Sequence, residues 1–130
     1  MSQFFALMWT VKPGTEEQVK EIFSNYGSPD PIVKDEDGNV TGKLLGTQVF
    51  IKGNTVVRVM EVEGSLPAIS VHLGRQPQIR EVESKLDPLI ETPRDMSNPQ
   101  GAAKFFMDTS MECLVARKLD AEQANGGGGQ

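Results

Sequence analysis

Residues 44–63 read LLGTQVFIKGNTVVRVMEVE, and this stretch decides the fold. Two runs rich in β-branched and other apolar residues, Leu44 to Lys52 and Thr55 to Glu63, flank the dipeptide Gly53-Asn54. That dipeptide is typical of a two-residue turn between antiparallel strands. We therefore predict a β-hairpin at the centre of the chain.

With a two-residue turn, Phe50 pairs with Val57 and Gln48 with Val59, which assigns every side chain to a face. One face carries Gly46, Gln48, Phe50, Val57, Val59 and Glu61. The other carries Thr47, Val49, Ile51, Val56, Arg58, Met60 and Val62. Both faces are largely apolar, so we expect something to cover each of them.

A strand and a helix precede the hairpin. Phe4 to Val11 is apolar on both alternating faces, as expected of a central strand. A helix should start at Thr15, where Gln18 stands at capping-box spacing, and should end by Gly27. The stretch from Ser28 to Lys43 predicts a long loop, with a small excursion turning at Asp37-Gly38. The apolar stripe of the helix is Val19, Ile22, Phe23 and Tyr26.

Further helices and a last strand follow the hairpin. Ser65 is expected to cap a helix that breaks near Gly74, and a second helical piece starts around Pro77. We predict a short helix over Ala102 to Met107 and a final strand over Thr109 to Leu119. Residues 1–119 would form one domain, and residues 120–130, with four consecutive glycines, a flexible tail.

Strand, helix, hairpin, helix and strand is the order of a ferredoxin-like (split βαβ) α+β domain, an antiparallel sheet with helices on one face. The other sheet face has no cover within the chain. A second copy is the simplest cover for so large an apolar surface. We therefore expect a homodimer of the dimeric α+β barrel type.

Composition narrows the function. The net charge of −5 and the lack of a basic cluster argue against nucleic acid as a partner. No run approaches the roughly 18 apolar residues of a membrane span, and the first residues lack a basic leader. We expect a cytoplasmic protein of 130 residues that forms a single domain.

The sequence contains no motif for binding a metal or a standard cofactor. One cysteine, Cys113, and one histidine, His72, cannot build the usual zinc sites. The acidic run 35–38 resembles part of a calcium-binding loop. With Gly38 at the sixth position of such a loop, however, the first and twelfth ligands would be Val33 and Leu44, which cannot serve, so the spacing excludes this site. No glycine-rich nucleotide motif is present. We expect neither a metal nor a bound cofactor.

Three side chains are candidates for catalysis. His72 carries the group best suited to proton transfer near neutral pH, although it could equally be a half-buried histidine hydrogen-bonded to a neighbour. Arg58 stands in mid-strand, so it should pair with an acid such as Glu61 or Glu112, or bind an enolate oxygen. Arg75, near the helix break, could address a phenolate or carboxylate or simply be solvated.

A hydrophobic, nearly uncharged ligand requires an apolar pocket with few polar groups. The apolar residues that could line such a pocket are equally suited to the hydrophobic core. The predicted substrate-binding residues are Trp9, Gln48, Phe50, Met60 and Arg94.

Several short strings together carry a family resemblance. They are Phe5-Ala6-Leu7, Val11 to Glu16, Asn25 to Pro31, Leu45-Gly46-Thr47, Arg75-Gln76-Pro77 and Pro93-Arg94-Asp95-Met96. Through them the chain resembles the SchA/CurD-like family over about Phe4 to Leu114. The resemblance implies a place in actinobacterial aromatic (type II) polyketide pathways, including those of spore pigments. Some members are joined to antibiotic-biosynthesis monooxygenase domains, but no catalytic residue set comes with the resemblance.

Three functions remain open. The first is a cyclase-like enzyme that directs ring closure of a poly-β-keto intermediate, in which His72 moves a proton and an arginine stabilises the enolate. The second is a cofactor-independent monooxygenase that oxidises a polycyclic phenol to a quinone. The third is a non-catalytic accessory protein that binds the intermediate or the polyketide synthase complex. A synthase or a monooxygenase is a further expected partner.

Overall fold

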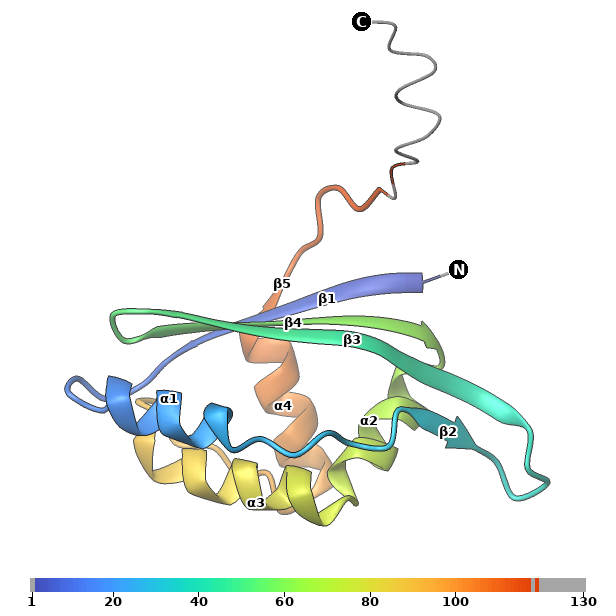
Figure 1. Cartoon of the computed structure of the whole chain (residues 1–130), viewed down its shortest axis with the longest axis horizontal. Helices are drawn as coiled ribbons and strands as arrows, with labels where there is room; N and C mark the ends of the chain where they lie inside the picture. The colour runs from blue at the N-terminus through green and yellow to red at the C-terminus, as the bar shows by residue number, and fades with distance from the viewer. Residues whose placement is uncertain (1, 118, 120–130) are drawn as a thin grey trace, which may run out of the picture.

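The computed structural model describes residues 2–117 and 119, which form an antiparallel sheet with all the helices on one side (Figure 1). The five strands lie in the order β2-β3-β4-β1-β5. The architecture confirms the predicted ferredoxin-like α+β fold. The strands are β1 (Ser2–Thr10), β2 (Ile32–Lys34), β3 (Val40–Lys52), β4 (Thr55–Gly64) and β5 (Ser110–Met111). The helices are α1 (Glu16–Ser24), α2 (Leu66–Gly74), α3 (Pro77–Leu86), the 3₁₀ turn η1 (Asp87–Leu89) and α4 (Pro99–Thr109).

The central hairpin has the predicted register. Phe50 pairs with Val57, Gln48 pairs with Val59, and Gly53 takes the positive φ of 59° that the turn requires. The first strand of the hairpin is longer than predicted, because β3 already begins at Val40. Its early part pairs with β2 across a turn at Gly38, so the expected excursion is confirmed and the loop is shorter.

The helical arm after the hairpin is confirmed as two pieces, α2 and α3. The Ser65 hydroxyl accepts a hydrogen bond of 3.2 Å from the backbone amide of Ala68 and so caps α2. The capping box predicted for α1 is not formed. The Thr15 hydroxyl instead donates to the carbonyl of Lys12, 2.6 Å away, and helix α1 ends at Ser24.

The C-terminal part departs most from prediction. Helix α4 is longer than the predicted Ala102 to Met107, because the Asn98 side chain caps it by accepting from the Gly101 amide at 2.7 Å. The predicted final strand is wrong beyond Met111, where the chain leaves β1. Alternating apolar residues show which side chains share a face, but a strand also needs a backbone to pair with. The predicted tail, 120–130, lies outside the described residues.

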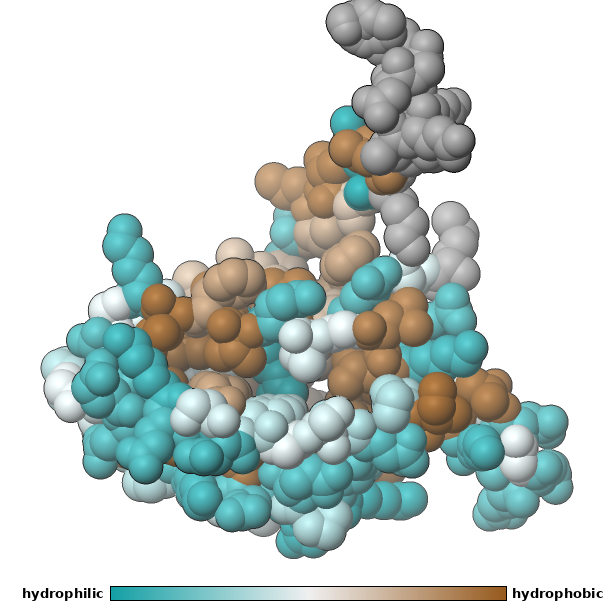
Figure 2. Space-filling model, viewed as in Figure 1, coloured by the Kyte–Doolittle hydropathy of each residue, from teal (hydrophilic) through white to brown (hydrophobic). Residues whose placement is uncertain are grey.

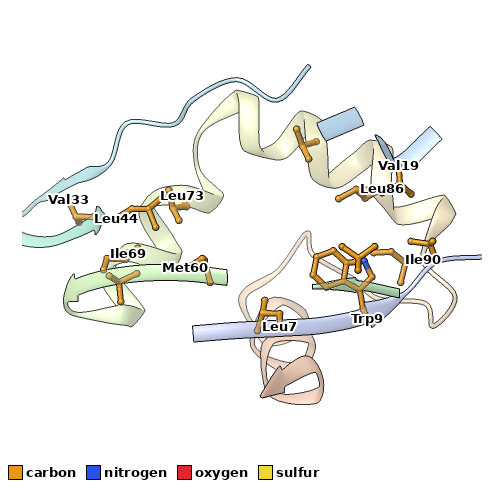
Figure 3. Close-up of a cluster of buried hydrophobic side chains, with 14 residues drawn as sticks. Leu7, Trp9, Val19, Val33, Leu44, Met60, Ile69, Leu73, Leu86 and Ile90 are labelled. Carbon is orange, nitrogen blue, oxygen red and sulfur yellow. The ribbon is translucent and has the colours of Figure 1, made fainter. Parts of the chain in front are cut away.

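The core lies between the sheet and the helices (Figure 3). Leu7 and Trp9 of β1 point toward Leu86 of α3 and Ile90. The most deeply buried large side chains are Ile69, Leu86, Val11, Val19, Val56 and Val62. Burial of these side chains fixes which sheet face meets the helices, so the side chains of that inner face alone can reach a helix.

The outer face of the sheet carries large apolar side chains in contact with solvent. Phe50 is 59% exposed and Met8 48% exposed, and Phe4 and Met111 are also exposed. Figure 2 shows hydrophobic residues gathered along the sheet side and on the segment after β5, while the helical side is mainly hydrophilic. Within the described ranges, no helix combines the length and apolarity needed to cross a membrane.

The core assignment predicts a contrast between two apolar residues of α2. Ile69→Ala removes a side chain that is 1% exposed and should lower the free energy of unfolding by about 2–5 kcal/mol. Val71→Ala removes a side chain that is 51% exposed and should change it by less than about 0.5 kcal/mol. Urea denaturation measures both, and equal losses would contradict the assignment.

Candidate functional site

Arg58 projects from the middle strand, β4, into the layer between sheet and helices. Its register partners Leu7 and Val49 lie on the same inner face. Its Nη2 donates a hydrogen bond of 2.8 Å to the hydroxyl oxygen of Tyr26, and its Nη1 lies 3.8 Å from a carboxylate oxygen of Glu83. The Arg58 side chain is only 11% exposed, so its charge interacts mainly with these two neighbours.

The acid that faces Arg58 is therefore Glu83 of α3, and the predicted partners Glu61 and Glu112 are wrong. Glu61 lies on the outer face, where it accepts a hydrogen bond of 2.8 Å from the Ser2 hydroxyl. Glu112 is exposed beyond β5. Neighbours along the strand could not serve, because the compensating carboxylate had to come from a helix packed over the inner face.

Arg94 anchors Glu83 from the other side. Its Nη2 donates to Glu83 Oε2 at 2.6 Å, and its Nε donates to Asp87 Oδ1 at 2.8 Å. The guanidinium also lies over the ring of Phe105, 4.5 Å from its centroid, and the side chain is 5% exposed. Arg94 is therefore hydrogen-bonded to two carboxylates, whereas Arg58 hydrogen-bonds directly to a neutral hydroxyl.

A pocket of about 310 Å³ opens beside Arg58, between α1 and β3. It is lined by Phe23, Tyr26, Thr47 and Val49. Arg58 touches this lining twice, because it donates to Tyr26 and pairs across the strands with Val49. The walls are thus mostly apolar or aromatic, and the polar side-chain groups of the lining are the hydroxyls of Tyr26 and Thr47.

Two polar atoms next to the pocket are buried without a hydrogen-bond partner among the described residues. They are the Thr47 hydroxyl and Nε of Arg58. Leaving such a group unpaired costs about 1–3 kcal/mol, so proteins rarely keep one without a use. Both groups can donate a hydrogen bond to an oxygen atom of a bound molecule. The arrangement therefore suits a flat apolar ligand that carries a carbonyl, enolate or phenolate oxygen.

Four of the predicted site residues lie in the layer between the sheet and the helices. Arg58 and Arg94 share Glu83, and the rings of Trp9 and Phe105 pack edge to face with their centroids 5.7 Å apart. Met60 is on the inner face of the sheet, as the register partner of Thr47. Trp9 and Met60 are part of the buried core. Only some of the predicted site residues therefore lie in the same layer as Arg58.

The other predicted residues lie away from the pocket lining. The imidazole of His72 donates from Nε2 to the carbonyl of Asp30 at 2.9 Å, which matches the alternative of a half-buried, hydrogen-bonded histidine. Arg75 is exposed just after α2. Gln48 and Phe50 stand on the outer face of the sheet, opposite the pocket.

Sequence reasoning missed the four residues that line the pocket and the acid that faces Arg58; the polar ones among them are Tyr26, Thr47 and Glu83. Tyr26 was indistinguishable from the apolar stripe of its helix, and nothing in its spacing marked the hydroxyl. Glu83 is one of two acids on α3, and its position gave no signal. Thr47 could have been found, because it belongs to the string Leu45-Gly46-Thr47 that carries the resemblance.

Two of the other resembling strings contact each other in the structure. The Gln76 side chain donates to the carbonyl of Asp30 at 3.1 Å and accepts from its amide at 2.8 Å, so it clamps the segment after α1 to the helix break. In the last string, hydrogen bonds from Ser97 and Asn98 hold the pKa of the Asp95 carboxyl below its ordinary value. These strings stabilise the loops that frame the inner layer.

The fold and the pocket define a small ferredoxin-like domain with a buried arginine beside an apolar cleft. Residues 2–118 match the model of the SchA/CurD like domain, and the chain belongs to that family. It is 43% identical over 109 residues to the "42.8 kDa protein in whiE locus" of Streptomyces coelicolor and 42% identical over 114 residues to "Polyketide synthase CurD" of Streptomyces cyaneus. The two matches cover 84% and 86% of this chain but only 26% and 30% of the relatives. "Protein SchA" of Streptomyces halstedii is 44% identical over 109 residues, which are 84% of this chain and 27% of that protein.

Solved structures with the same fold are more distant in sequence. A putative antibiotic biosynthesis monooxygenase from Chloroflexus aurantiacus superposes with a TM-score of 0.56 at 14% identity, over 92% of this chain and 98% of the other. Tetracenomycin F2 cyclase from Streptomyces glaucescens, a type-II polyketide cyclase, superposes with a TM-score of 0.51 at 12% identity, over 91% and 99%. At these identities the likeness concerns the fold alone.

The site predicts that Arg94 anchors the charge cluster. Arg94→Met leaves two carboxylates without their shared cation and should lower the free energy of unfolding by about 3–5 kcal/mol. Lys85→Met breaks an exposed helical pair with Glu81 and should cost less than about 0.5 kcal/mol. Chemical denaturation of both variants measures the difference, and an Arg94→Met protein as stable as the wild type would contradict the anchoring role.

Proposed function

We propose that this domain acts in aromatic polyketide biosynthesis as a cyclase-like enzyme that directs ring closure and aromatisation of a poly-β-keto intermediate. The observation that carries the proposal is the apolar pocket with two unpartnered buried polar groups, Thr47 Oγ1 and Arg58 Nε, at its side. The pathway is supported by the family and by a relative named as a polyketide synthase.

The chemistry of ring closure matches these groups. A carbon between two carbonyls, in its enol form, attacks a ketone along the same chain, so negative charge develops on the oxygen of the ketone. A guanidinium held in place beside the pocket stabilises that charge better than water would, since it is already oriented. The apolar walls formed by Phe23 and Val49 favour the folded chain over the extended one.

A cofactor-independent monooxygenase is the alternative, favoured by the likeness to a putative monooxygenase fold. The same pocket would hold a phenol, with Arg58 facing the phenolate that reacts with oxygen. A non-catalytic accessory role is the third possibility. It would use the pocket for binding alone, and the polyketide synthase or a monooxygenase would then be the partner.

Product masses separate these functions. The polyketide synthase and early enzymes of the pathway are incubated in air with and without the protein, and the products are analysed by mass spectrometry. The proposal predicts an isomer with a new ring or loss of water. A gain of one oxygen with loss of two hydrogens would contradict it in favour of the monooxygenase, and identical products would leave only the accessory role.

Arg58→Lys tests the site itself. Lysine keeps the charge opposite Glu83 but removes the Nε donor, so ring closure should slow by about 10²-fold. Arg75→Lys, a matched change at an exposed position, should leave the rate unchanged. Initial rates of aromatic product formation measure both. Equal rates for Arg58→Lys and the wild type would contradict the proposed site.

The proposed assembly is a homodimer joined through the outer sheet faces. The centre of that face, around Ala6, Met8, Val59 and Phe50, is uncharged, so a second copy of the same face can approach it without repulsion. Charged residues such as Glu61 and Lys52 lie toward its ends. Burial of these exposed apolar side chains would supply the driving force.

Phe50→Asp should prevent this dimer, because it places a carboxylate at the centre of the buried face. Val71→Asp introduces the same charge at an exposed apolar position on α2 and should leave the dimer intact. Light scattering coupled to size-exclusion chromatography gives the mass of each. A monomeric wild type, or a dimeric Phe50→Asp variant, would contradict the assembly.

A further inference from the structure

Tyr26 stands where the pocket meets Arg58. Its ring stacks on Phe23 with centroids 5.9 Å apart and planes inclined by 15°, which orients the phenol. Its oxygen accepts the 2.8 Å hydrogen bond from Arg58, so the hydroxyl proton is directed to a different acceptor. Because Tyr26 lines the pocket, a bound molecule can be that acceptor.

We infer that Tyr26 is the proton-transfer residue of the proposed ring closure, an assignment that rests on the proposed function. The substrate class is a poly-β-ketone in its enol form. The enol carbon attacks a ketone carbon, a new C–C bond forms, and the π bond of the ketone breaks. The ketone oxygen takes the phenolic proton of Tyr26.

The step balances without an oxidant or a reductant. After the attack, the former enol is a protonated carbonyl, and it returns its proton to the phenolate oxygen of Tyr26. The proton that leaves the residue is therefore replaced within the same turnover. Arg58 faces the phenolate while it exists, and a charge-assisted hydrogen bond of this kind is stronger than a neutral one.

The neighbouring groups are less suited to this transfer. His72 directs its Nε2 proton to the Asp30 carbonyl and is not among the residues that line the pocket. Glu83 lies between two guanidiniums, where its carboxylate accepts a hydrogen bond from Arg94 and balances the charge of Arg58. Thr47 has a hydroxyl at the pocket, but no described group hydrogen-bonds to it. Tyr26 combines a place in the lining with a cation bound to its oxygen.

Tyr26→Phe tests the assignment because it keeps the ring that stacks on Phe23 and removes only the hydroxyl. The substrate is a thioester of a short poly-β-keto acid, and the aromatic product is followed by absorbance. We expect kcat to fall by about 10²–10⁴-fold while KM changes little. The matched control, Val49→Ala, alters the pocket wall without removing a proton donor or the ring that stacks on Tyr26, and should act mainly on KM.

The outcomes separate this inference from the function on which it rests. A wild type that closes no ring overturns both. A wild type that closes the ring while Tyr26→Phe retains its kcat overturns only the assignment of Tyr26. If the variant does not fold, as judged by circular dichroism, the wild-type kcat in heavy water decides. A rate lowered by about twofold or more supports the transfer, and an unchanged rate overturns it.

Discussion

The charge of Arg58 is the constraint on which the inner layer depends. A guanidinium that projects from the middle strand toward the helices must be compensated there, because water has little access to it. Glu83 supplies the carboxylate, Arg94 holds Glu83, and Asp87 and Phe105 hold Arg94. The positions of α3, of the turn that follows it and of α4 are thereby coupled to one side chain of the sheet.

The charge of Arg58 is compensated less completely than the charge of Arg94. Arg94 is bound by two carboxylates at hydrogen-bond distance, whereas the carboxylate nearest Arg58 is 3.8 Å away. Arg58 therefore keeps donor capacity on the side where Tyr26 and Thr47 line an apolar pocket. The two apolar faces of the sheet thus differ: the inner face holds the pocket, and the outer face exposes the apolar side chains that we propose a second copy covers.

Local patterns were sufficient to predict much of the fold. The Gly53-Asn54 turn and the apolar runs around it set the hairpin register, and Ser65 and Pro77 marked the starts of α2 and α3. The candidate site was harder, since the Arg58–Glu83 pair joins distant segments that only packing brings together. His72 attracted attention for its chemistry, yet its hydrogen bond to Asp30 depends on a loop whose path no periodicity reveals.

The most direct test of the account is whether Arg58 Nε meets the ligand. Nitrogen-15 NMR of the arginine side chains, during titration with a dihydroxynaphthalene as a phenolic probe, observes this N–H group itself. The account predicts a saturable shift of the Arg58 Nε–H signal, with the signal of the exposed Arg75 unchanged. An Arg58 signal that stays unchanged up to saturating probe would contradict the assignment of the site to the inner layer.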